Sequence, residues 1–395
     1  MIIQAKLSNP LRPEIEPIDI SFPITHYENK YEELADMGIG DAIERDCRID
    51  EISGPFAVLS ALRGKNVNVD ELDYLAKRLE SFFEPEALQY EGAAAAKEVS
   101  SIEDFINLTF CCQKATVITD FSDLNAIGRD HYINKNGGSA PISVLDGLDT
   151  EQVAKDLIQK QNGKITSYGV VYENGMTIEP RYKGKAFPAY LYKPCVIDVA
   201  LKKESMPDTE ATYLQLPMPD VCLERAIIRG GLNDTADPNL ECMVFDPSYR
   251  ILSEIDLDAE TPQNLNKIAK VLSDMDDSYL LTLEAAVEYI KPRSTTTLWE
   301  LAEHIELFEF YPNVSNAVEY GRHMIMNSGH FQYDAELDEF YDFAGYGNWR
   351  LENERGKFLD SGYICYMGDA PLEDLFTEPE KAPEQDSSMG GMNMT

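Results

Sequence analysis

Basic residues are scarce in this sequence of 395 residues, which has 34 lysines and arginines against 70 aspartates and glutamates. The formal net charge of −36 argues against direct binding to DNA, RNA or an anionic membrane, because each needs cationic patches on the protein. No window of 18 residues is both apolar and uncharged, so we expect no membrane-spanning helix. The first residues lack the basic segment and apolar run of a secretory signal, and we therefore expect a cytoplasmic protein.

Cysteine is also sparse and has no pattern. The seven cysteines form no C-x-x-C pair, and only Cys111 and Cys112 lie close together in the sequence. An odd number without metal-ligand spacing predicts reduced thiols in the core rather than a disulfide framework or a zinc site.

An internal repeat organises the chain. A shift of 193 residues gives 15 identities in 51 positions when it aligns 70–94 with 263–287, 122–134 with 315–327, and 163–175 with 356–368. A shift of 194 pairs Phe22-Pro23 with Leu216-Pro217. We therefore predict a first repeat over 1–175, a joint over 176–194, a second repeat over 195–370 and an acidic, disordered tail over 371–395.

Charge follows the repeats. Residues 13–175 carry 30 acidic and 14 basic side chains, and residues 212–370 carry 29 and 11. The intervening residues 176–211 carry 5 and 6. Acidity is thus a property of both repeats and is absent from the stretch between them.

Hydrophobic periodicity predicts an α+β fold, in which each repeat contains small α/β and helical subdomains and the whole chain is elongated. Apolar residues at helical spacing predict helices over 69–83, 262–275 and 297–310, and another that leads from Val314 through Gly321. Alternation predicts strands over 18–22 and 213–216, each stopped by proline, and closing strands over 170–172 and 363–366.

Catalytic and metal-binding patterns are absent or incomplete. Glu300 and His304 give E-x-x-x-H but no H-E-x-x-H. Asp274, Asp276 and Asp277 lack the glycine of a calcium loop, which favours a solvated turn between helices. Cys111 or Cys112 with His131 could form a thiol nucleophile pair, but a buried thiol is the preferred interpretation. We therefore expect a protein without enzymatic activity, cofactor or metal.

The carboxylates are the unusual feature. Glutamates recur every three residues along the predicted helix 297–310, opposite its apolar face, and like charges at this spacing destabilise a helix. A second acidic stretch, 334–342, is interleaved with aromatic residues. A solvated face that keeps the protein soluble is one interpretation. The other interpretation is that the acidic surface imitates the charge of DNA. At the spacing of duplex DNA, about 1.7 Å per charge, 36 charges cover about 60 Å, or roughly 18 base pairs.

Both repeats contain a strand ending in proline, a leucine-rich helix at 72–79 or 265–272, and a helix start at Ser101 or Thr297. A Gly-Arg junction follows, and the second repeat adds the stretch from Tyr346-Gly347 to Glu354 and the strand Gly362-Tyr363-Ile364. In these features the sequence resembles the ArdA-type antirestriction proteins of conjugative elements and phages. Family members are about one repeat long, form three small domains and pair into a curved DNA mimic that blocks Type I restriction-modification enzymes. This chain carries two such units in tandem.

The resemblance and the charge together predict an acidic DNA mimic in a bacterial host cell. Its partner would be a DNA-binding defence protein, a Type I methyltransferase-specificity complex, bound by an elongated monomer or homodimer. An acidic adaptor for another basic protein and an unrecognised hydrolase remain the alternatives. The acidic surface is predicted to comprise Glu300, Glu303, Glu306, Glu309, Glu319, Asp334, Glu336, Asp338, Glu339, Asp342, Glu352, Glu354 and Asp360.

Overall fold

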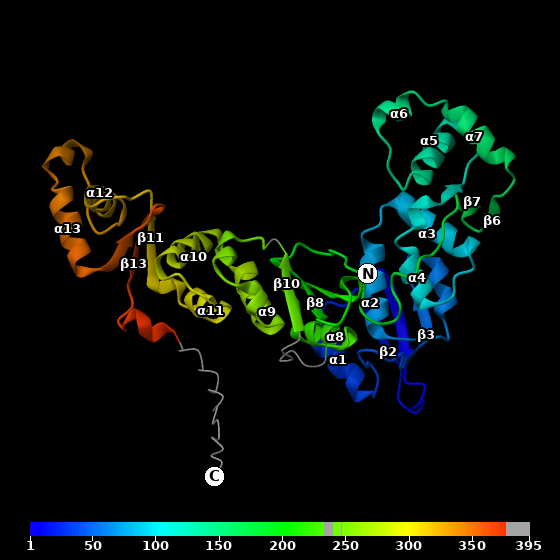
Figure 1. Ribbon diagram of the computed structural model, residues 1–395, viewed down its shortest axis with the longest axis horizontal. Helices are drawn as coiled ribbons and strands as arrows, with labels where there is room; N and C mark the ends of the chain where they lie inside the picture. The colour runs from blue at the N-terminus through cyan, green and yellow to red at the C-terminus, as the bar shows by residue number, and fades with distance from the viewer. Residues whose placement is uncertain (233–239, 246, 377–395) are drawn as a thin grey trace, which may run out of the picture. The chain divides into compact units, whose positions relative to one another are not determined.

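The computed structural model describes residues 1–232, 240–245 and 247–376 (Figure 1). The chain divides into two compact units, residues 1–245 and 246–395, which are called unit 1 and unit 2 below. Helices and small antiparallel sheets occur in both units, and this confirms the predicted α+β class. Within the described ranges, no helix is long and apolar enough to cross a membrane. Most of the tail for which the sequence predicts disorder lies outside the described residues.

Unit 1 begins with an antiparallel sheet in the order β2-β1-β3-β4. Its strands are β1 (Ile3–Ser8), β2 (Ile18–Phe22), β3 (Cys47–Ser53) and β4 (Asn66–Val67). In β1 the side chains of Ile3, Ala5 and Leu7 are buried, as the two-residue period of a strand that covers a core requires. The predicted strand over 18–22 is present as β2. It follows β1 in the chain and pairs with it.

Four helices accompany this sheet: α1 (Tyr27–Asp36), α2 (Val69–Glu80), α3 (Glu84–Ala96) and α4 (Ile102–Leu108). Helix α2 is the predicted helix over 69–83, with Leu72, Leu75 and Leu79 buried at helical spacing. Its start is fixed by a capping box, in which the Asn68 side chain accepts from the Asp70 N–H and the Glu71 carboxylate accepts from the Asn68 N–H.

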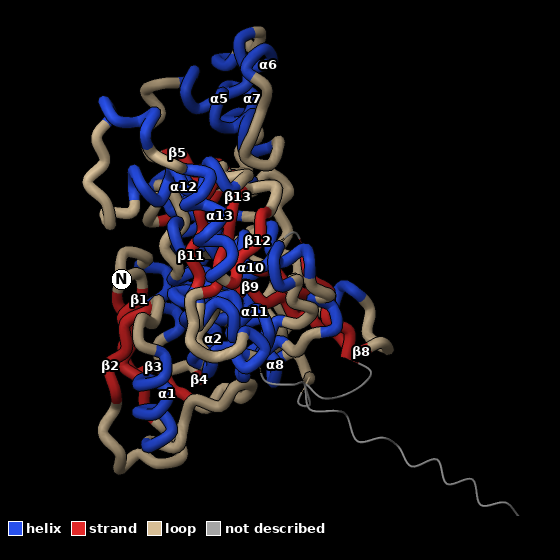
Figure 2. Tube along the Cα trace, turned by 90° about the vertical axis from the view of Figure 1, so that its left-hand side faces the viewer, coloured by secondary structure: helices blue, strands red, loops and turns tan. Residues whose placement is uncertain are grey.

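A sheet with a helix pair follows in unit 1, over residues 116–175, and is called the first helix-pair subdomain. The strands β5 (Thr116–Ile118), β6 (Lys164–Thr166) and β7 (Gly169–Tyr172) lie in the order β5-β7-β6. Helices α5 (Leu124–Lys135) and α7 (Thr150–Gln159) pack together, with the short α6 (Ile142–Asp146) beside them (Figure 2). A Cβ on Gly128 would lie 1.8 Å from the Thr150 carbonyl oxygen, so only glycine permits this approach.

The rest of unit 1 consists of the segment 176–194, a three-stranded sheet and one helix. The segment packs on α2: Tyr182 is buried in the core, and the Phe187 ring stacks on Tyr74 at 4.5 Å between ring centroids. The sheet has the order β10-β8-β9, with β8 (Ile197–Lys203), β9 (Thr212–Leu216) and β10 (Leu240–Phe245), and α8 (Asp220–Arg229) follows β9. Strand β9 is the predicted strand over 213–216.

Unit 2 opens with three helices, α9 (Pro262–Asp274), α10 (Asp277–Ile290) and α11 (Thr295–Glu303). Helix α9 matches the predicted helix over 262–275, and its Leu265, Ile268 and Leu272 are buried. The predicted helix over 297–310 is wrong in its second half. Helix α11 ends at Glu303, a short 3-10 turn covers Ile305–Leu307, and strand β11 (Phe308–Pro312) begins immediately after it.

The second helix-pair subdomain, residues 308–367, closes unit 2. Strands β11, β12 (Arg355–Phe358) and β13 (Gly362–Tyr366) have the order β11-β13-β12, and α12 (Ala317–Asn327) packs against α13 (Phe343–Asn353). A Cβ on Gly321 would lie 2.0 Å from the Phe343 carbonyl oxygen. Pairing with β13 explains why residues 308–312 are extended, since a strand there satisfies the backbone of both strands.

Candidate functional site

Ten of the thirteen predicted surface acids are exposed in unit 2. They lie at the end of α11 and in the following turn and strand, on α12, in the segment between α12 and α13, on α13, and just after β12. The exposed acids are Glu303, Glu306, Glu309, Glu319, Asp334, Glu336, Glu339, Asp342, Glu352 and Asp360. None of these ten forms an ion pair with a cation in the part of the chain that the structure describes.

Two predicted surface residues are not on the surface. Glu300 lies on the buried side of α11 and is only 8% exposed. Glu354 pairs with Arg350 and accepts a hydrogen bond of 2.6 Å from the Tyr320 hydroxyl, so its charge is already neutralised inside the subdomain. The predicted glutamate stripe along one helix is also wrong, because Glu306 lies in the 3-10 turn and Glu309 on β11.

Asp338 is half-buried and serves to hold the segment between α12 and α13. It accepts hydrogen bonds from the Tyr333 hydroxyl at 2.7 Å and from Arg322 at 2.9 Å. The Tyr333 hydrogen bond, and after it Arg322, hold the pKa of the Asp338 carboxyl below its usual value. The Arg322 guanidinium also lies over the Phe343 ring, 4.2 Å from its centroid, so one arginine contacts a carboxylate and a ring together.

Several exposed acids also shape the backbone. Asp342 caps α13 by accepting the Gly345 N–H at 2.8 Å, and Asp334 accepts the Glu336 N–H at 2.9 Å. Glu319 accepts from both the N–H and the hydroxyl of Ser315, and these bonds lower the pKa of its carboxyl. Such contacts order the segment that carries the charges without removing them from solvent.

The two units differ in how many cations accompany their acids. Residues 1–245 contain 40 acidic and 24 basic side chains, whereas residues 246–395 contain 30 and 10. In unit 2 the arginines Arg322 and Arg350 are engaged with Asp338 and Glu354. The exposed carboxylates of unit 2 therefore present their charge to solvent or to a partner.

The thiol and histidine considered from sequence lie in the interior of unit 1. Cys111 and Cys112 are buried, and burial raises the pKa of both thiols, which disfavours the nucleophilic thiolate. His131 is buried beside the Thr116 hydroxyl, 3.2 Å from its Nδ1, and burial lowers its pKa to about 4. It also lines a hollow of about 460 Å³ together with Lys135 and Lys160.

The other motifs occupy structural positions. His304 follows the last residue of α11. Asp274, Asp276 and Asp277 are exposed where α9 ends and α10 begins, in agreement with the predicted turn. Among the described residues, no group of three or more His, Cys, Asp or Glu side chains is arranged to hold a metal ion.

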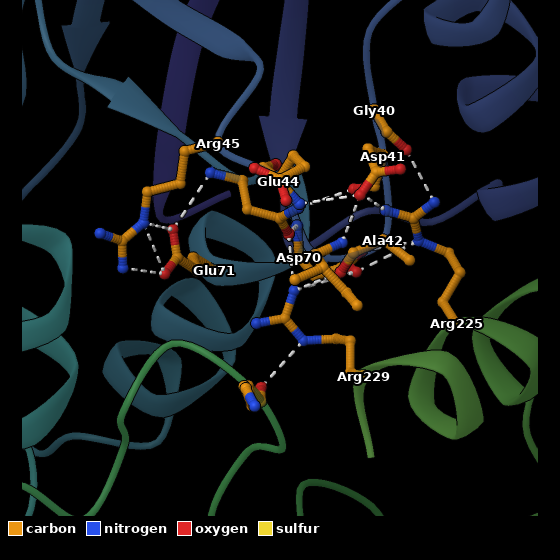
Figure 3. A network of polar contacts seen from close by, with 12 residues as sticks. Gly40, Asp41, Ala42, Glu44, Arg45, Asp70, Glu71, Arg225 and Arg229 are labelled. Atoms are coloured by element: carbon orange, nitrogen blue, oxygen red, sulfur yellow. Dashed lines mark hydrogen bonds and ion pairs between the residues drawn. The ribbon is translucent and has the colours of Figure 1, made fainter. Parts of the chain in front are cut away.

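A buried arginine network in unit 1 escaped the sequence analysis (Figure 3). Arg225, on α8, donates to Asp70 at 3.0 Å and to the carbonyl oxygens of Gly40 and Asp41 at 2.8 and 2.9 Å. Its guanidinium also lies 4.0 Å from the centroid of the Tyr31 ring on α1. The shift of 194 that relates the repeats places Arg225 on Tyr31, so two corresponding positions touch each other.

Arg229, one turn further along α8, completes this network. It is 3% exposed and donates to Asn68 Oδ1 at 3.0 Å and to the carbonyl oxygen of Lys185 at 3.1 Å, and it also contacts the Ala42 carbonyl and the Tyr182 hydroxyl. The network therefore fastens α8 to the start of α2 and to the segment 176–194. The only sequence signal is a pair of arginines at i and i+4 on a largely apolar helix, and their partners lie between 44 and 187 residues away.

No protein-family model matches the chain, and no curated protein matches it.

Proposed function

We propose that this protein is a non-enzymatic DNA mimic, which inhibits a bacterial defence enzyme by occupying its DNA-binding groove. The target we propose is the methyltransferase-specificity complex of a Type I restriction-modification system. The observation that carries the proposal is the set of ten exposed carboxylates in unit 2 that form no ion pair with a cation among the described residues, in a unit where acids outnumber bases by 30 to 10. A basic groove that accepts phosphates also attracts carboxylates, since both present negatively charged oxygen atoms.

Charge density supports mimicry of a duplex. Unit 2 has a formal net charge of −20. At the DNA spacing of about 1.7 Å per charge, this corresponds to about 34 Å, or roughly ten base pairs. An excess of this size raises the rate of encounter with a basic partner and makes binding depend strongly on ionic strength.

We also propose that the chain is a tandem duplication, and strand register supports this. In the helix-pair subdomains, Ile118 pairs with Val170, and Tyr311 pairs with Tyr363 after the shift of 193. In the first sheets of the repeats, Ile3 pairs with Phe22, and Ile197 with Leu216 after the shift of 194. The offsets found in the sequence therefore also relate the strand pairings of the two repeats, which were not used to find those offsets.

The proposal is tested by displacement of a fluorescent duplex from a purified Type I methyltransferase-specificity complex. The test variant changes Glu303, Glu306 and Glu352 to Gln, which preserves side-chain size and removes three exposed charges. Each lost charge contact costs about 0.5 kcal/mol, so we expect about ten-fold weaker displacement.

The matched control changes three exposed glutamates of unit 1, Glu16, Glu28 and Glu32, to Gln. It removes the same charge from the less acidic unit, and we expect a smaller loss. Failure of the wild-type protein to displace the duplex would reject the proposal. Equal losses in the two triple variants would reject the assignment of the surface to unit 2. Binding that duplex DNA does not displace would favour an acidic adaptor.

A further inference from the structure

Aromatic residues distinguish the two helix-pair subdomains. Residues 331–353 contain seven aromatic side chains, whereas the segment at the same place in the first subdomain, 138–160, contains none. Both segments include the second helix of the pair. The shared architecture therefore does not require aromatic residues in this segment.

Three of these rings form a continuous strip at the surface. Phe331 meets Tyr346 edge to face at 5.3 Å between centroids, and Tyr346 stacks with Trp349 at 6.0 Å. We call Phe331, Tyr346 and Trp349 the aromatic strip. Tyr346 packs against the subdomain core, while Phe331 is 46% and Trp349 58% exposed. Single exposed apolar side chains are ordinary, but connected exposed rings are typical of an interaction surface.

Carboxylates flank the strip along the chain and on α13. Asp334, Glu336, Glu339 and Asp342 are exposed between Phe331 and Tyr346, and Glu352 is exposed on α13 one turn after Trp349. A ring face attracts a cation through its quadrupole, and a carboxylate attracts it through its charge. A planar guanidinium satisfies both at once better than an ammonium, because it stacks on a ring while its edge forms hydrogen bonds.

The subdomain already contains one such arrangement. Arg322 lies over the Phe343 ring at 4.2 Å while it donates to Asp338 at 2.9 Å. The exposed strip offers the same combination, a ring face with carboxylates nearby, to an arginine from another molecule.

We propose that the aromatic strip and its flanking carboxylates form a docking surface for arginine side chains of a basic protein partner. This inference rests on the proposed function, since the partner is the DNA-binding protein whose groove the carboxylates enter. It adds that arginine, rather than positive charge alone, is recognised at this place. Nucleic acid is disfavoured as the occupant because the flanking carboxylates repel phosphate.

The test uses Trp349 as its own reporter. The chain has two tryptophans, so Trp299→Phe leaves Trp349 as the single tryptophan. This protein is titrated with nona-arginine and with nona-lysine at physiological ionic strength. We expect the fluorescence of Trp349 to change with both peptides and nona-arginine to bind about five-fold more tightly.

Variants separate the rings from the general acidity. Calorimetry gives the ratio of the affinity for nona-arginine to the affinity for nona-lysine. In the full chain, we expect Trp349→Leu and Phe331→Leu each to lower this ratio by at least about two-fold. The control is Phe83→Leu, which removes a phenylalanine of unit 1 that is 76% exposed and lies next to Glu84. We expect this change to leave the ratio as in the wild type.

Equal affinities for the two peptides, or a ratio that survives both strip variants, would overturn the inference. Quenching of Trp349 by a single-stranded oligodeoxynucleotide at similar concentration would also overturn it. These measurements contain no restriction enzyme. A preserved arginine preference together with failure to displace DNA from the Type I complex would therefore reject the proposed function and not the docking surface.

Discussion

The two helix-pair subdomains share their backbone but not their surfaces. Each has a three-stranded sheet in the order first, third, second, and each brings two helices into contact at a glycine. Gly128 faces the Thr150 carbonyl and Gly321 faces the Phe343 carbonyl, and one offset of 193 residues relates the two pairs. Because the backbones approach so closely, neither position can accept a side chain, and the choice of residue is more restricted there than at an exposed position.

The differences lie in the side chains around that shared backbone. Residues 116–175 contain eight acidic and five basic side chains, against ten and four in residues 308–367. At the position of the buried His131 the second subdomain has the buried Met324. One architecture therefore carries a buried histidine and a surface of mixed charge in the first subdomain, and a buried methionine with an acidic, aromatic surface in the second.

The largest expected effect concerns two arginines: Arg229, which is buried in unit 1, and Arg322, which is exposed in the second subdomain. Arg229→Met should destabilise unit 1 by about 3–5 kcal/mol, because it leaves buried oxygen atoms of Asn68 and Ala42 without their donor. Arg322→Met, which removes an exposed ion pair, should cost less than about 1 kcal/mol. Urea denaturation of the two variants measures both values, and equal losses would contradict the distinction.

The shared helix contact predicts equal damage in both subdomains. Gly128→Ala and Gly321→Ala should each cost about 3 kcal/mol, since the added Cβ would overlap a backbone oxygen that cannot move without separating the helices. Gly147→Ala is the control, because its Cβ would meet no atom closer than 3.8 Å. Thermal unfolding monitored by circular dichroism gives the comparison. A neutral Gly321→Ala would show that the two contacts are not equivalent.

The buried histidine predicts a pH dependence of stability in the first subdomain, because the second subdomain has Met324 at the same position. The pKa of His131 is lowered to about 4 by burial, below the usual value of 6.5, so the folded state holds it neutral. Its contribution is present above about pH 6.5 and is lost as the pH falls toward 4, and in full it amounts to about 3 kcal/mol.

The variant His131→Met, which installs the residue of the second subdomain, should flatten the decline in unfolding free energy between pH 6.5 and 4. The quantity to compare is this slope, because the variant can also change stability at neutral pH. An unchanged slope would show that His131 titrates normally in the folded protein.

The smallest expected effect concerns the helix caps. Asp149 accepts the Gln152 N–H at the start of α7, and Asp342 accepts the Gly345 N–H at the start of α13. The offset of 193 relates these caps as well. Asp149→Ala and Asp342→Ala should each cost about 1 kcal/mol, the typical value for an N-cap. If the denaturation midpoints of the two variants differed widely, the two helix caps would not be equivalent.

Local and repeated features were predictable from the sequence. Helices α2 and α9 and strands β2, β7, β9 and β13 follow from apolar periodicity, and each lies close to its predicted range. The exposure of ten acidic residues also agrees with the expected solvent-facing carboxylates.

Features that depend on distant partners were not predictable. Ile305 and Phe308 fit a helical face, but Phe308 begins a strand because β13 supplies the pairing. Burial of Glu300 and neutralisation of Glu354 depend on neighbours that no local pattern reveals. The docking of α8 through Arg225 and Arg229 likewise joins residues far apart in sequence, and the compact units consequently divide after residue 245, within the second predicted repeat.

DNA mimicry is tested most directly by asking whether the protein and a duplex bind a Type I methyltransferase-specificity complex at the same time. The affinity of a fluorescent duplex for the purified complex is measured by anisotropy at a series of protein concentrations. Mimicry predicts mutually exclusive binding, in which the apparent dissociation constant of the duplex rises linearly and without limit as protein is added. A plateau in that constant, or a ternary complex of enzyme, duplex and protein, would contradict it.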